Sequence, residues 1–328
     1  MKSIVVAIID CFSPSILEKL GTKFPSHWTI SAVTENTVEA RLSVLKKADI
    51  TLMMAAKLDR YLLDSAPNLI YVQKMGAGVD NIDVDYCKEN NIGVARLDAG
   101  NHIPVAEHTV MMILAATRRL VDFDHQTRMG IWGKEIARGT NKQVHGKTIG
   151  IIGLGAIGRR VAHLLHHFGA ELIYCDPVPA PHEMTDHLGL RQVSLEELIS
   201  LADIITLHLP LNTETSGLIS AIRIKSMKPG SILINCARGG LVDENALAMA
   251  LENGHLFAAA VDTFSIEPVI DSPLLNLETA ILSPHCAGAT FDNFDSIAER
   301  SIMNAVAFIN NEPLPEKDLV YDPRFLSP

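Results

Sequence analysis

Three polar side chains in the last third of the chain are of types that could bind an anion and move a proton. Arg238, Glu267 and His285 each lie shortly after an apolar run that is typical of a buried strand. The carboxyl ends of strands in an open α/β sheet form the edge where ligands bind. The sequence therefore predicts that a guanidinium, which binds carboxylates, and an imidazole, which transfers protons, lie at one edge of a sheet.

A glycine-rich turn upstream predicts a dinucleotide site. Gly153, Gly155 and Gly158 form a G-x-G-x-x-G motif that directly follows an apolar strand and opens a helix. The first N–H groups of a helix are unpaired and carry partial positive charge, so Ala156 and Ile157 belong to the expected pyrophosphate site. The alternative is a turn that only packs a helix against a strand.

An acidic residue at the end of the next strand favours NAD as the cofactor. Asp176 lies 18 positions beyond Gly158, close to where a carboxylate is expected to bind the adenosine ribose. A carboxylate accepts hydrogen bonds from a ribose 2'-hydroxyl but repels the 2'-phosphate of NADP. Arg159 and Arg160 lie on the first turn of the helix and not at a strand end, so we expect them to be surface charges.

Short apolar runs alternate with helical patterns along the whole chain, which predicts an α/β fold with parallel sheets covered by helices. The 328 residues exceed the ~250 to 300 at which one hydrophobic core stops growing, so two domains are expected. A first series of strands is expected at Ile4–Ile9, Ile50–Met53, Ile70–Lys74 and Ile92–Ala95. A second series is expected at Thr148–Ile152, Leu172–Cys175, Ile204–His208, Ile232–Asn235, Phe257–Asp262 and Ala280–Ser283.

Three further segments connect or follow these series. Val105–Arg119 is apolar and contains neither glycine nor proline, which predicts a long buried helix. The polar segment Asp122–Gly146 has no clear periodicity; it could be an interdomain connection or a dimer arm, or a surface loop packed by Trp132. Apolar residues in Asn293–Asn310 are spaced as in an amphipathic helix, which we expect to return to the first domain.

The composition argues against several classes of function. With 38 acidic and 28 basic residues, the formal net charge of -10 repels nucleic acid. No run approaches the ~18 consecutive apolar residues that span a membrane. The five cysteines are odd in number and include no C-x-x-C pair, which indicates neither a disulfide framework nor a metal site. These features predict a cytoplasmic protein whose partner is a small molecule.

The order of the motifs resembles the D-2-hydroxyacid dehydrogenase family over nearly the whole chain. Upstream of the glycine-rich turn, Gly76-Ala77-Gly78-Val79-Asp80-Asn81 is similar to the family's substrate loop. Downstream, His208-Leu209-Pro210-Leu211 is similar to its cofactor-side loop. The segments that contain Arg238, Glu267 and His285 then follow in the family's order.

This resemblance implies a domain organisation. The fold would be α/β, with two doubly wound parallel-sheet, Rossmann-like domains, of which the first is discontinuous. Residues 1–101 and 288–328 would form a flavodoxin-like substrate-binding domain, and residues 102–287 the NAD-binding domain. The resemblance also implies a homodimer joined through the second domain.

The resemblance further implies roles for individual residues. Arg238, Glu267 and His285 would be the catalytic trio, and Asp262 would bind the nicotinamide carboxamide. The other implied cofactor-binding positions are His208, Pro210, Cys236, Ala237 and Gly288. The activity implied is hydride transfer between NAD(H) and a small 2-hydroxy or 2-keto acid.

The residue types suit that chemistry. Reduction of a 2-keto acid places negative charge on the carbonyl oxygen as the hydride arrives, so His285 would donate a proton and would accept one in reverse. Glu267 would stabilise the charged imidazole near neutral pH. The planar guanidinium of Arg238 can bind carboxylate and carbonyl oxygens together.

The sequence gives fewer indications of which residues bind the substrate. Backbone N–H groups of Gly76, Ala77 and Gly78 could bind the substrate carboxylate. Lys74 lies where phosphoglycerate dehydrogenase-like members often carry an arginine, so it could bind a phosphate or could be a solvated surface charge. Phosphoglycerate, hydroxypyruvate and glyoxylate all remain open as substrates.

Two other functions occur on similar scaffolds. Formate dehydrogenases share the scaffold but pair the histidine with a glutamine, and Glu267 argues against that branch. The alternative from another class is an NAD-sensing regulator, similar to the corepressors built on this fold, which would bind the dinucleotide without significant turnover.

Overall fold

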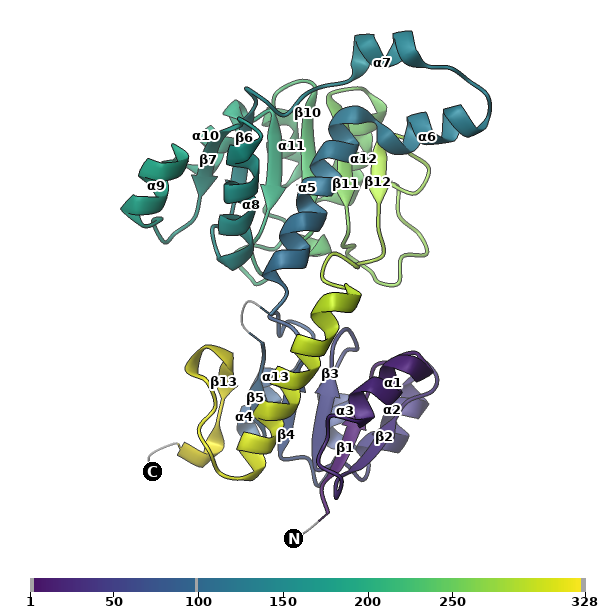
Figure 1. The fold of residues 1–328 in the computed structure, drawn as a ribbon, viewed down its shortest axis with the longest axis vertical. Helices are drawn as coiled ribbons and strands as arrows, with labels where there is room; N and C mark the ends of the chain where they lie inside the picture. Colours follow the sequence, from purple (N-terminus) through teal and green to yellow (C-terminus); the bar gives the residue numbers. More distant parts are fainter. Residues whose placement is uncertain (1–2, 98–99, 326–328) are drawn as a thin grey trace. The chain divides into compact units, whose positions relative to one another are not determined.

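The computed structural model of the chain describes residues 3–97 and 100–325 (Figure 1). The chain forms two compact units, residues 1–101 with 291–328 (unit 1) and residues 102–290 (unit 2). From the sequence, we expected the chain to return from the NAD-binding domain to the first domain between residues 287 and 288. The structure places it where helix α13 (Phe291–Ile309) begins, because the preceding residues belong to a turn that packs in unit 2.

Unit 1 contains a six-stranded sheet in the order β13-β5-β4-β3-β1-β2. The strands are parallel except β13, which pairs antiparallel with β5. The central strands β1, β3, β4 and β5 are almost entirely buried, as in parallel sheets covered by helices on both faces. The strand bounds are β1 (Val5–Ile8), β2 (Thr29–Ala32), β3 (Ile50–Met53), β4 (Tyr71–Lys74), β5 (Gly93–Ala95) and β13 (Leu319–Tyr321).

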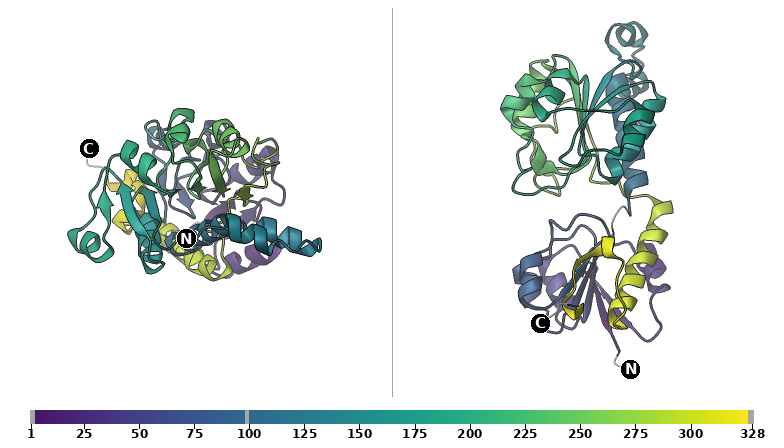
Figure 2. Two further views of the ribbon diagram at one scale, coloured as in Figure 1. Left: turned by 90° about the horizontal axis from the view of Figure 1, so that it is seen from above. Right: turned by 90° about the vertical axis from the view of Figure 1, so that its left-hand side faces the viewer.

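Helices cover both faces of this sheet (Figure 2). One core cluster joins α1 (Pro14–Gly21) and α13 to the sheet, and Tyr71 of β4 stacks on Phe308 of α13 at 4.3 Å between ring centroids. The amphipathic helix that the sequence predicted near the end of the chain therefore packs in unit 1. The other face of the sheet packs against α2 (Val38–Leu45), α3 (Arg60–Asp64) and α4 (Val84–Glu89). Two short 3-10 turns, η2 (Glu316–Asp318) and η3 (Pro323–Phe325), lie near the end of the chain.

Unit 2 contains a seven-stranded parallel sheet in the order β12-β11-β10-β9-β6-β7-β8. The strand order reverses between β6 and β9, and ligands bind at such a switch point in doubly wound folds. The strand bounds are β6 (Thr148–Ile152), β7 (Glu171–Cys175), β8 (Arg191–Gln192), β9 (Ile204–Leu207), β10 (Ser231–Asn235), β11 (Leu256–Val261) and β12 (Ala280–Leu282).

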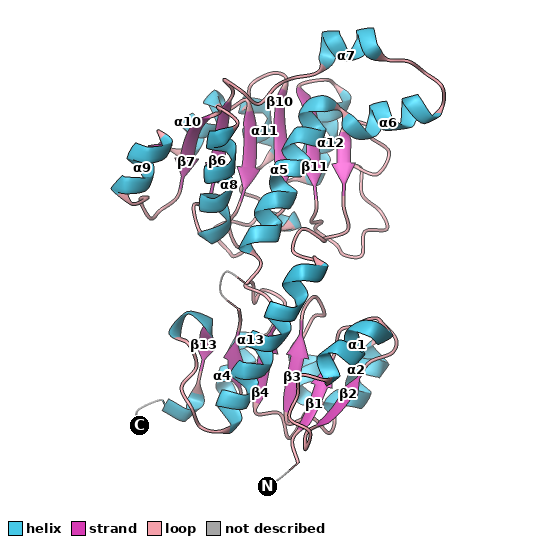
Figure 3. Cartoon of the chain, viewed as in Figure 1, coloured by secondary structure: helices cyan, strands magenta, loops and turns pink. Residues whose placement is uncertain are grey.

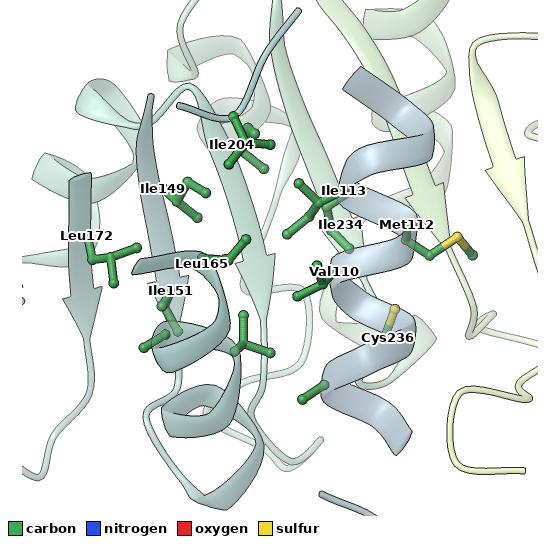
Figure 4. Packing of buried hydrophobic residues seen from close by; sticks show 14 of the residues in the cluster. Val110, Met112, Ile113, Ile149, Ile151, Leu165, Leu172, Ile204, Ile234 and Cys236 are labelled. Atoms are coloured by element: carbon green, nitrogen blue, oxygen red, sulfur yellow. The ribbon is translucent and has the colours of Figure 1, made fainter. Parts of the chain in front are cut away.

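Two helical layers also cover this sheet. Figure 4 shows Val110 and Ile113 of α5 (His102–Arg118) facing Ile234 of the sheet, with Leu165 of α8 (Ala156–His167) beside Ile151. The buried helix predicted after Val105 is thus α5. The opposite face packs against α10 (Leu195–Leu201), α11 (Ala221–Ser226) and α12 (Glu244–Glu252). The remaining short elements are α9 (His182–Leu188) and η1 (Gly239–Leu241).

The sequence missed three strands, and all three lie at sheet edges (Figure 3). β2, β8 and β13 contain no fully buried residue, so they lack the continuous apolar run that identified the central strands. None of the helices within the described residues is long and apolar enough to cross a membrane.

The polar segment after α5 forms two helices, α6 (Leu120–Arg128) and α7 (Lys134–Thr140), which extend from the end of α5 beyond the sheet (Figure 1). Neither helix buries a residue in this chain. Trp132 between them is 80% exposed. The interpretation of this segment as a loop packed by its tryptophan is therefore wrong, because the indole has no core to enter. We call residues 120–140 the arm.

Candidate active site

The glycine-rich turn lies at the switch point of the unit 2 sheet. Gly153 directly follows β6 and has a φ of +91°, and a Cβ added there would lie 2.4 Å from the carbonyl oxygen of His208. His208 directly follows β9, the strand on the other side of the switch point. Glycine is therefore required at position 153 both for its backbone conformation and for contact between the two loops.

The other two glycines of the motif differ in what surrounds them. A Cβ at Gly158 would lie 2.1 Å from the carbonyl oxygen of Gly153, so this glycine allows α8 to pack closely on the turn. A Cβ at Gly155 would meet no atom within 4 Å. Gly155 is the N-cap of α8, and the first backbone bond of the helix runs from the Arg159 N–H to its carbonyl. The earlier N–H groups and this open space fit a pyrophosphate.

Asp176 lies at the mouth of the same turn. Its carboxylate accepts hydrogen bonds from the Leu154 N–H at 2.6 Å and the Val178 N–H at 2.8 Å. Asp176, which the sequence predicts to bind the ribose, therefore lies beside the glycine motif. It is 22 residues away in the sequence from Leu154, whose N–H it binds. Arg159 and Arg160 are exposed, in agreement with their expected place on the surface.

The loop after β9 presents a neutral histidine. Burial lowers the pKa of His208 to about 3, so its imidazole carries no charge at neutral pH. Its Nε2 lies 3.0 Å from the Thr206 hydroxyl. Pro210, two residues further on, is exposed, and its carbonyl accepts a hydrogen bond from Thr215 at 2.7 Å.

His285 and Glu267 form a hydrogen-bonded pair in the loops after β12 and β11. The Nδ1 of His285 lies 2.7 Å from Oε2 of Glu267, while Oε1 of Glu267 accepts the Phe264 N–H at 2.9 Å. His285 has a left-handed backbone with φ of +51°, and its N–H donates to the Asp262 carbonyl at 2.7 Å. This uncommon conformation at a side chain with a fixed partner is typical of functional sites.

The electrostatics of this pair keep the carboxylate ionised. Burial opposes ionisation of Glu267, but hydrogen bonds from His285 and the Phe264 N–H, with the charges of His285 and Arg238, lower the pKa of this carboxyl below its ordinary value. The His285 side chain is 42% exposed. Within residues 3–97 and 100–325, its ring hydrogen-bonds at Nδ1, so Nε2 is available to a ligand.

Arg238 reaches the pair because a glycine follows it. A Cβ at Gly239 would lie 1.9 Å from the carbonyl carbon of Phe264, so only glycine permits this contact between the loops after β10 and β11. The Asn235 side chain fixes the first loop by donating to the Arg238 carbonyl at 2.8 Å and accepting the Ala237 N–H at 3.1 Å. The guanidinium itself donates to the Ala237 carbonyl at 2.7 Å.

A second polar network surrounds Asp262, which is fully buried. One carboxylate oxygen accepts the Ser283 hydroxyl at 2.5 Å and the Cys286 N–H at 2.9 Å, and the other accepts the Ala287 N–H at 2.9 Å. His108 of α5 places its Nε2 3.2 Å from the Ser283 hydroxyl. The carboxylate predicted to bind nicotinamide is thus held in one orientation.

Sequence analysis missed Gly239, Ser283 and His108 as parts of the site. No local pattern singled out His108, because α5 also carries Glu107 and Thr109 beside it. The donor atoms of His108, Asp262 and Cys286 lie within 4.8 Å of one another, a spacing that could hold a metal ion. The hydrogen bonds around Asp262 account for that cluster without an ion.

The cysteines near the site are poorly suited to be nucleophiles. Burial raises the pKa of Cys236 to about 12, and desolvation followed by the charge of Asp262 raises the pKa of Cys286. All five cysteines of the chain are free thiols. The cytoplasmic location suggested by the sequence stays a prediction.

The remaining predicted site residues are Gly288 in unit 2 and four residues of unit 1. Gly288 follows the histidine loop, and its carbonyl accepts the Thr290 N–H at 3.2 Å. Lys74, Gly76, Ala77 and Gly78 belong to unit 1. Lys74 is only 7% exposed, so the interpretation of it as a solvated surface lysine is wrong.

Comparisons with known proteins find related sequences and folds. Residues 110–287 match the family model described as D-isomer specific 2-hydroxyacid dehydrogenase, NAD binding domain. A D-3-phosphoglycerate dehydrogenase of Mycobacterium leprae is 36% identical over 333 residues, which cover 96% of this chain and 62% of that protein. The chain thus spans less than two thirds of the length of that relative.

Two solved structures show the same fold over nearly the whole chain. An NAD-dependent formate dehydrogenase from Staphylococcus aureus in complex with NAD has a TM-score of 0.86 at 28% identity, covering 97% of this chain and 98% of that one. A D-lactate dehydrogenase from Aquifex aeolicus, complexed with NAD and lactic acid, has a TM-score of 0.83 at 28% identity, covering 96% and 98%.

Proposed function

Because this chain belongs to the D-isomer specific 2-hydroxyacid dehydrogenase family, we propose that it interconverts a small 2-hydroxy acid and the matching 2-keto acid with NAD(H). The observation that carries this proposal is the 2.7 Å contact between His285 Nδ1 and Glu267 Oε2, with Nε2 of the same ring available to a ligand. Such a pair is a proton donor and acceptor positioned by a carboxylate.

NAD is the cofactor, and when bound it supplies or accepts the hydride. In the direction of reduction, His285 Nε2 donates a proton to the carbonyl oxygen of the substrate as negative charge develops there. Glu267 stabilises the imidazolium before the transfer and orients the ring through Nδ1. In the direction of oxidation, the neutral ring accepts the proton of the substrate hydroxyl.

Other residues of unit 2 would bind and orient the substrate and the cofactor. Arg238 binds the substrate carboxylate and polarises the carbonyl, because a guanidinium presents several donors in one plane. The buried carboxylate of Asp262 would accept a hydrogen bond from the nicotinamide carboxamide and so determine which face of the ring meets the substrate. The glycine motif and α8 would bind the pyrophosphate, and Asp176 the adenosine ribose.

The proposal is tested by following NADH absorbance with glyoxylate, hydroxypyruvate and phosphohydroxypyruvate as substrates. We expect turnover of at least one of them, and its loss in an Arg238→Ala variant that still binds NADH. If NADH binds but no keto acid in a broader set is reduced, the NAD-sensing regulator becomes the better assignment.

Replacing Asp176 by alanine is expected to weaken NAD binding and to relax the preference for NAD over NADP. The carboxylate that repels a 2'-phosphate would be gone, and the Leu154 N–H in the glycine turn would lose its acceptor. The ratio of kcat/KM values for NADH and NADPH measures the effect. Glu183→Ala, on α9 in the same unit, is the control, and an unaltered ratio in Asp176→Ala would show that another group selects the cofactor.

The arm is the proposed homodimer interface. It exposes Leu120, Val121, Met129, Ile131, Trp132 and Ile136, each more than half exposed. Beside it, residues of α5 to α8 line a mainly apolar hollow of about 800 Å³. An apolar surface of this kind, on helices that bury no residue in their own chain, marks a contact with another protein. A second copy of the chain would present the same apolar surface, so that two copies can cover each other in a closed symmetric dimer.

Replacing Trp132 by glutamate is therefore expected to shift the protein from dimer to monomer, because a charge would be buried in an apolar contact. Light scattering during size-exclusion chromatography measures the mass. Ile222→Glu is the matched control, because Ile222 is 79% exposed on α11 and lies outside the arm. A wild-type protein that elutes with the mass of one chain would contradict the interface.

A further inference from the structure

A polar hollow of about 590 Å³ lies in unit 2, at the edge of the sheet opposite to the proposed active site. Its lining includes the first residues of β9 and β10 and the segment that follows α7. Figure 3 shows α7 beyond the amino-terminal ends of these strands. The glycine turn and the catalytic loops all follow carboxyl ends of strands. A ligand in this hollow would therefore be neither the proposed cofactor nor the proposed substrate.

Positive charge dominates the lining of this hollow, which we call the basic hollow. Its cationic residues are Arg118, Arg138, Lys142 and Lys147. Asp203 is the one carboxylate among the lining residues that the structure describes, and it accepts hydrogen bonds from the Thr148 N–H at 2.9 Å and from Lys228 at 3.1 Å. The whole chain has a net charge of -10, so the basic hollow has the opposite sign to the rest of the protein.

Most of these cations have no anionic partner in the chain. Arg138 pairs with the exposed Glu135 at 3.3 Å. Within residues 3–97 and 100–325, no ion pair involves Arg118, Lys142 or Lys147. The basic hollow therefore offers charge to a ligand without first breaking an ion pair at these three residues.

Lys142 is the cation most enclosed by its surroundings. Its ammonium donates to the Gly230 carbonyl and lies 4.4 Å from the centroid of the Phe257 ring. An ammonium has three donors, so the bond to Gly230 leaves donors for a ligand. Burial, and after it the charge of Lys147, lower the pKa of Lys142 below its ordinary value. An anion between the two ammonium groups would offset their repulsion.

A buried hydroxyl in the same lining lacks a hydrogen-bond partner. Ser231 begins β10 and is 2% exposed, and in the part of the chain that the structure describes its hydroxyl neither donates nor accepts a hydrogen bond. Buried polar side chains are nearly always paired with protein, water or a ligand. The Ser231 hydroxyl can donate to an anion, so it adds a neutral donor to the cations around it.

We propose that the basic hollow binds a small anion with at least two negative charges, of the phosphate-ester or pyrophosphate class, at a site separate from the active site. Arginine binds phosphate oxygens in pairs, and lysine binds them as a point charge. No aromatic side chain is among the described lining residues, so nothing there would stack on a nucleoside base. Because Arg138 belongs to the arm, the bound anion would also join the end of the arm to the sheet.

The first experiment measures binding of pyrophosphate by calorimetry in saturating NADH, which occupies the glycine turn. We expect one site per chain, with an affinity that falls as salt is added. Glycerol 3-phosphate and citrate are titrated in the same way and distinguish a phosphate ester and a polycarboxylate from pyrophosphate. Failure of both phosphate compounds to bind at millimolar concentration would overturn the proposal, and so would tighter binding of citrate than of either.

The second experiment places the site by variants. Lys142→Met and Lys147→Met are each expected to weaken binding of pyrophosphate about tenfold or more, the usual scale for a charge-assisted hydrogen bond. Lys147 makes no hydrogen bond within the described residues, so its variant separates loss of the ligand contact from loss of structure. Lys225→Met, exposed on α11, is the matched control and should bind as the wild type does. An equal affinity in all three variants, or an equal loss in all three, would overturn the proposal.

Arg238→Ala separates this site from the proposed active site. It is expected to bind pyrophosphate as tightly as the wild type, and a loss of binding in this variant would place the anion at the catalytic loops and overturn the proposal. Amide hydrogen exchange with and without pyrophosphate, in saturating NADH, gives the location directly. We expect slower exchange in residues 134–147. Protection of residues 153–158 with no change in residues 134–147 would overturn the proposal.

Discussion

Replacing His285 by alanine is expected to lower turnover by ~10² to 10⁴, the usual contribution of a positioned acid or base, while NADH binding survives. The imidazole donates the proton that the carbonyl oxygen must receive, and alanine cannot. The cofactor contacts proposed here lie on other segments, at the glycine turn and at Asp262. Steady-state kinetics give the loss of turnover, and quenching or enhancement of NADH fluorescence gives the binding constant.

The control for this variant is His167→Ala. His167 is exposed at the end of α8, where its Nδ1 contacts the His163 carbonyl at 2.8 Å, and it is remote in sequence from every proposed catalytic group. Its replacement should leave turnover unchanged. An unchanged rate in His285→Ala would instead remove this residue from the mechanism, and a parallel loss of NADH binding would indicate damage to the unit 2 loops.

The parts of the fold that sequence predicted are those with a strong local signal. The central strands of both sheets are buried on two faces, so each is a continuous aliphatic run, as in Ile50–Met53 and Thr148–Ile152. The glycine motif could be recognised because two of its positions, Gly153 and Gly158, leave no room for a Cβ and therefore require glycine. Residues that directly follow such strands, such as His285, could therefore be placed at a sheet edge.

Contacts between distant segments could not be predicted in the same way. The hydrogen bond of His108 to Ser283 joins residues 175 positions apart, and nothing local in either segment indicates it. The burial of Lys74 could not be predicted, because it depends on a loop 20 residues earlier in the sequence. The edge strands β2, β8 and β13 and the two helices of the arm were not predicted, because half-exposed elements have no continuous apolar pattern.

The catalytic geometry depends on two of these unpredicted features. Gly239 lets the loop that carries Arg238 touch Phe264, and the Phe264 N–H binds the far oxygen of Glu267. The same backbone therefore holds the two loops together and leaves the other oxygen of Glu267 for His285. Three neighbouring strands bring the residues to one edge, and loop contacts then set their orientation.

Replacing Glu267 by glutamine is expected to move the pH profile of reduction to lower pH. The amide can still bind Nδ1 but carries no negative charge, so the protonated imidazole loses its ionic partner and the neutral ring is favoured. The rate of reduction near neutral pH should therefore fall in Glu267→Gln, and the loss relative to the wild type should grow as the pH rises.

Both limbs of the pH profiles move toward lower pH in Glu267→Gln, but the effect on the rate differs between the two directions of reaction. Reduction requires the charged ring and declines as pH rises, so its alkaline limb moves toward acid in Glu267→Gln. Oxidation requires the neutral ring and rises with pH, so its acid limb also moves toward acid, and oxidation below neutral pH is expected to suffer less than reduction. Profiles of kcat/KM for both directions measure the two shifts.

The wild-type carboxylate itself does not limit these profiles near neutral pH, because its pKa is lowered below the ordinary value by its partners. By linkage, the stability that the ionised form contributes is present above the unfolded pKa of a glutamate and is lost only as pH falls through the lowered folded value. Unfolding measured at acid and neutral pH should therefore show a smaller difference in Glu267→Gln than in the wild type. Unshifted rate profiles in both directions would mean that the 2.7 Å contact orients the ring without stabilising its charge.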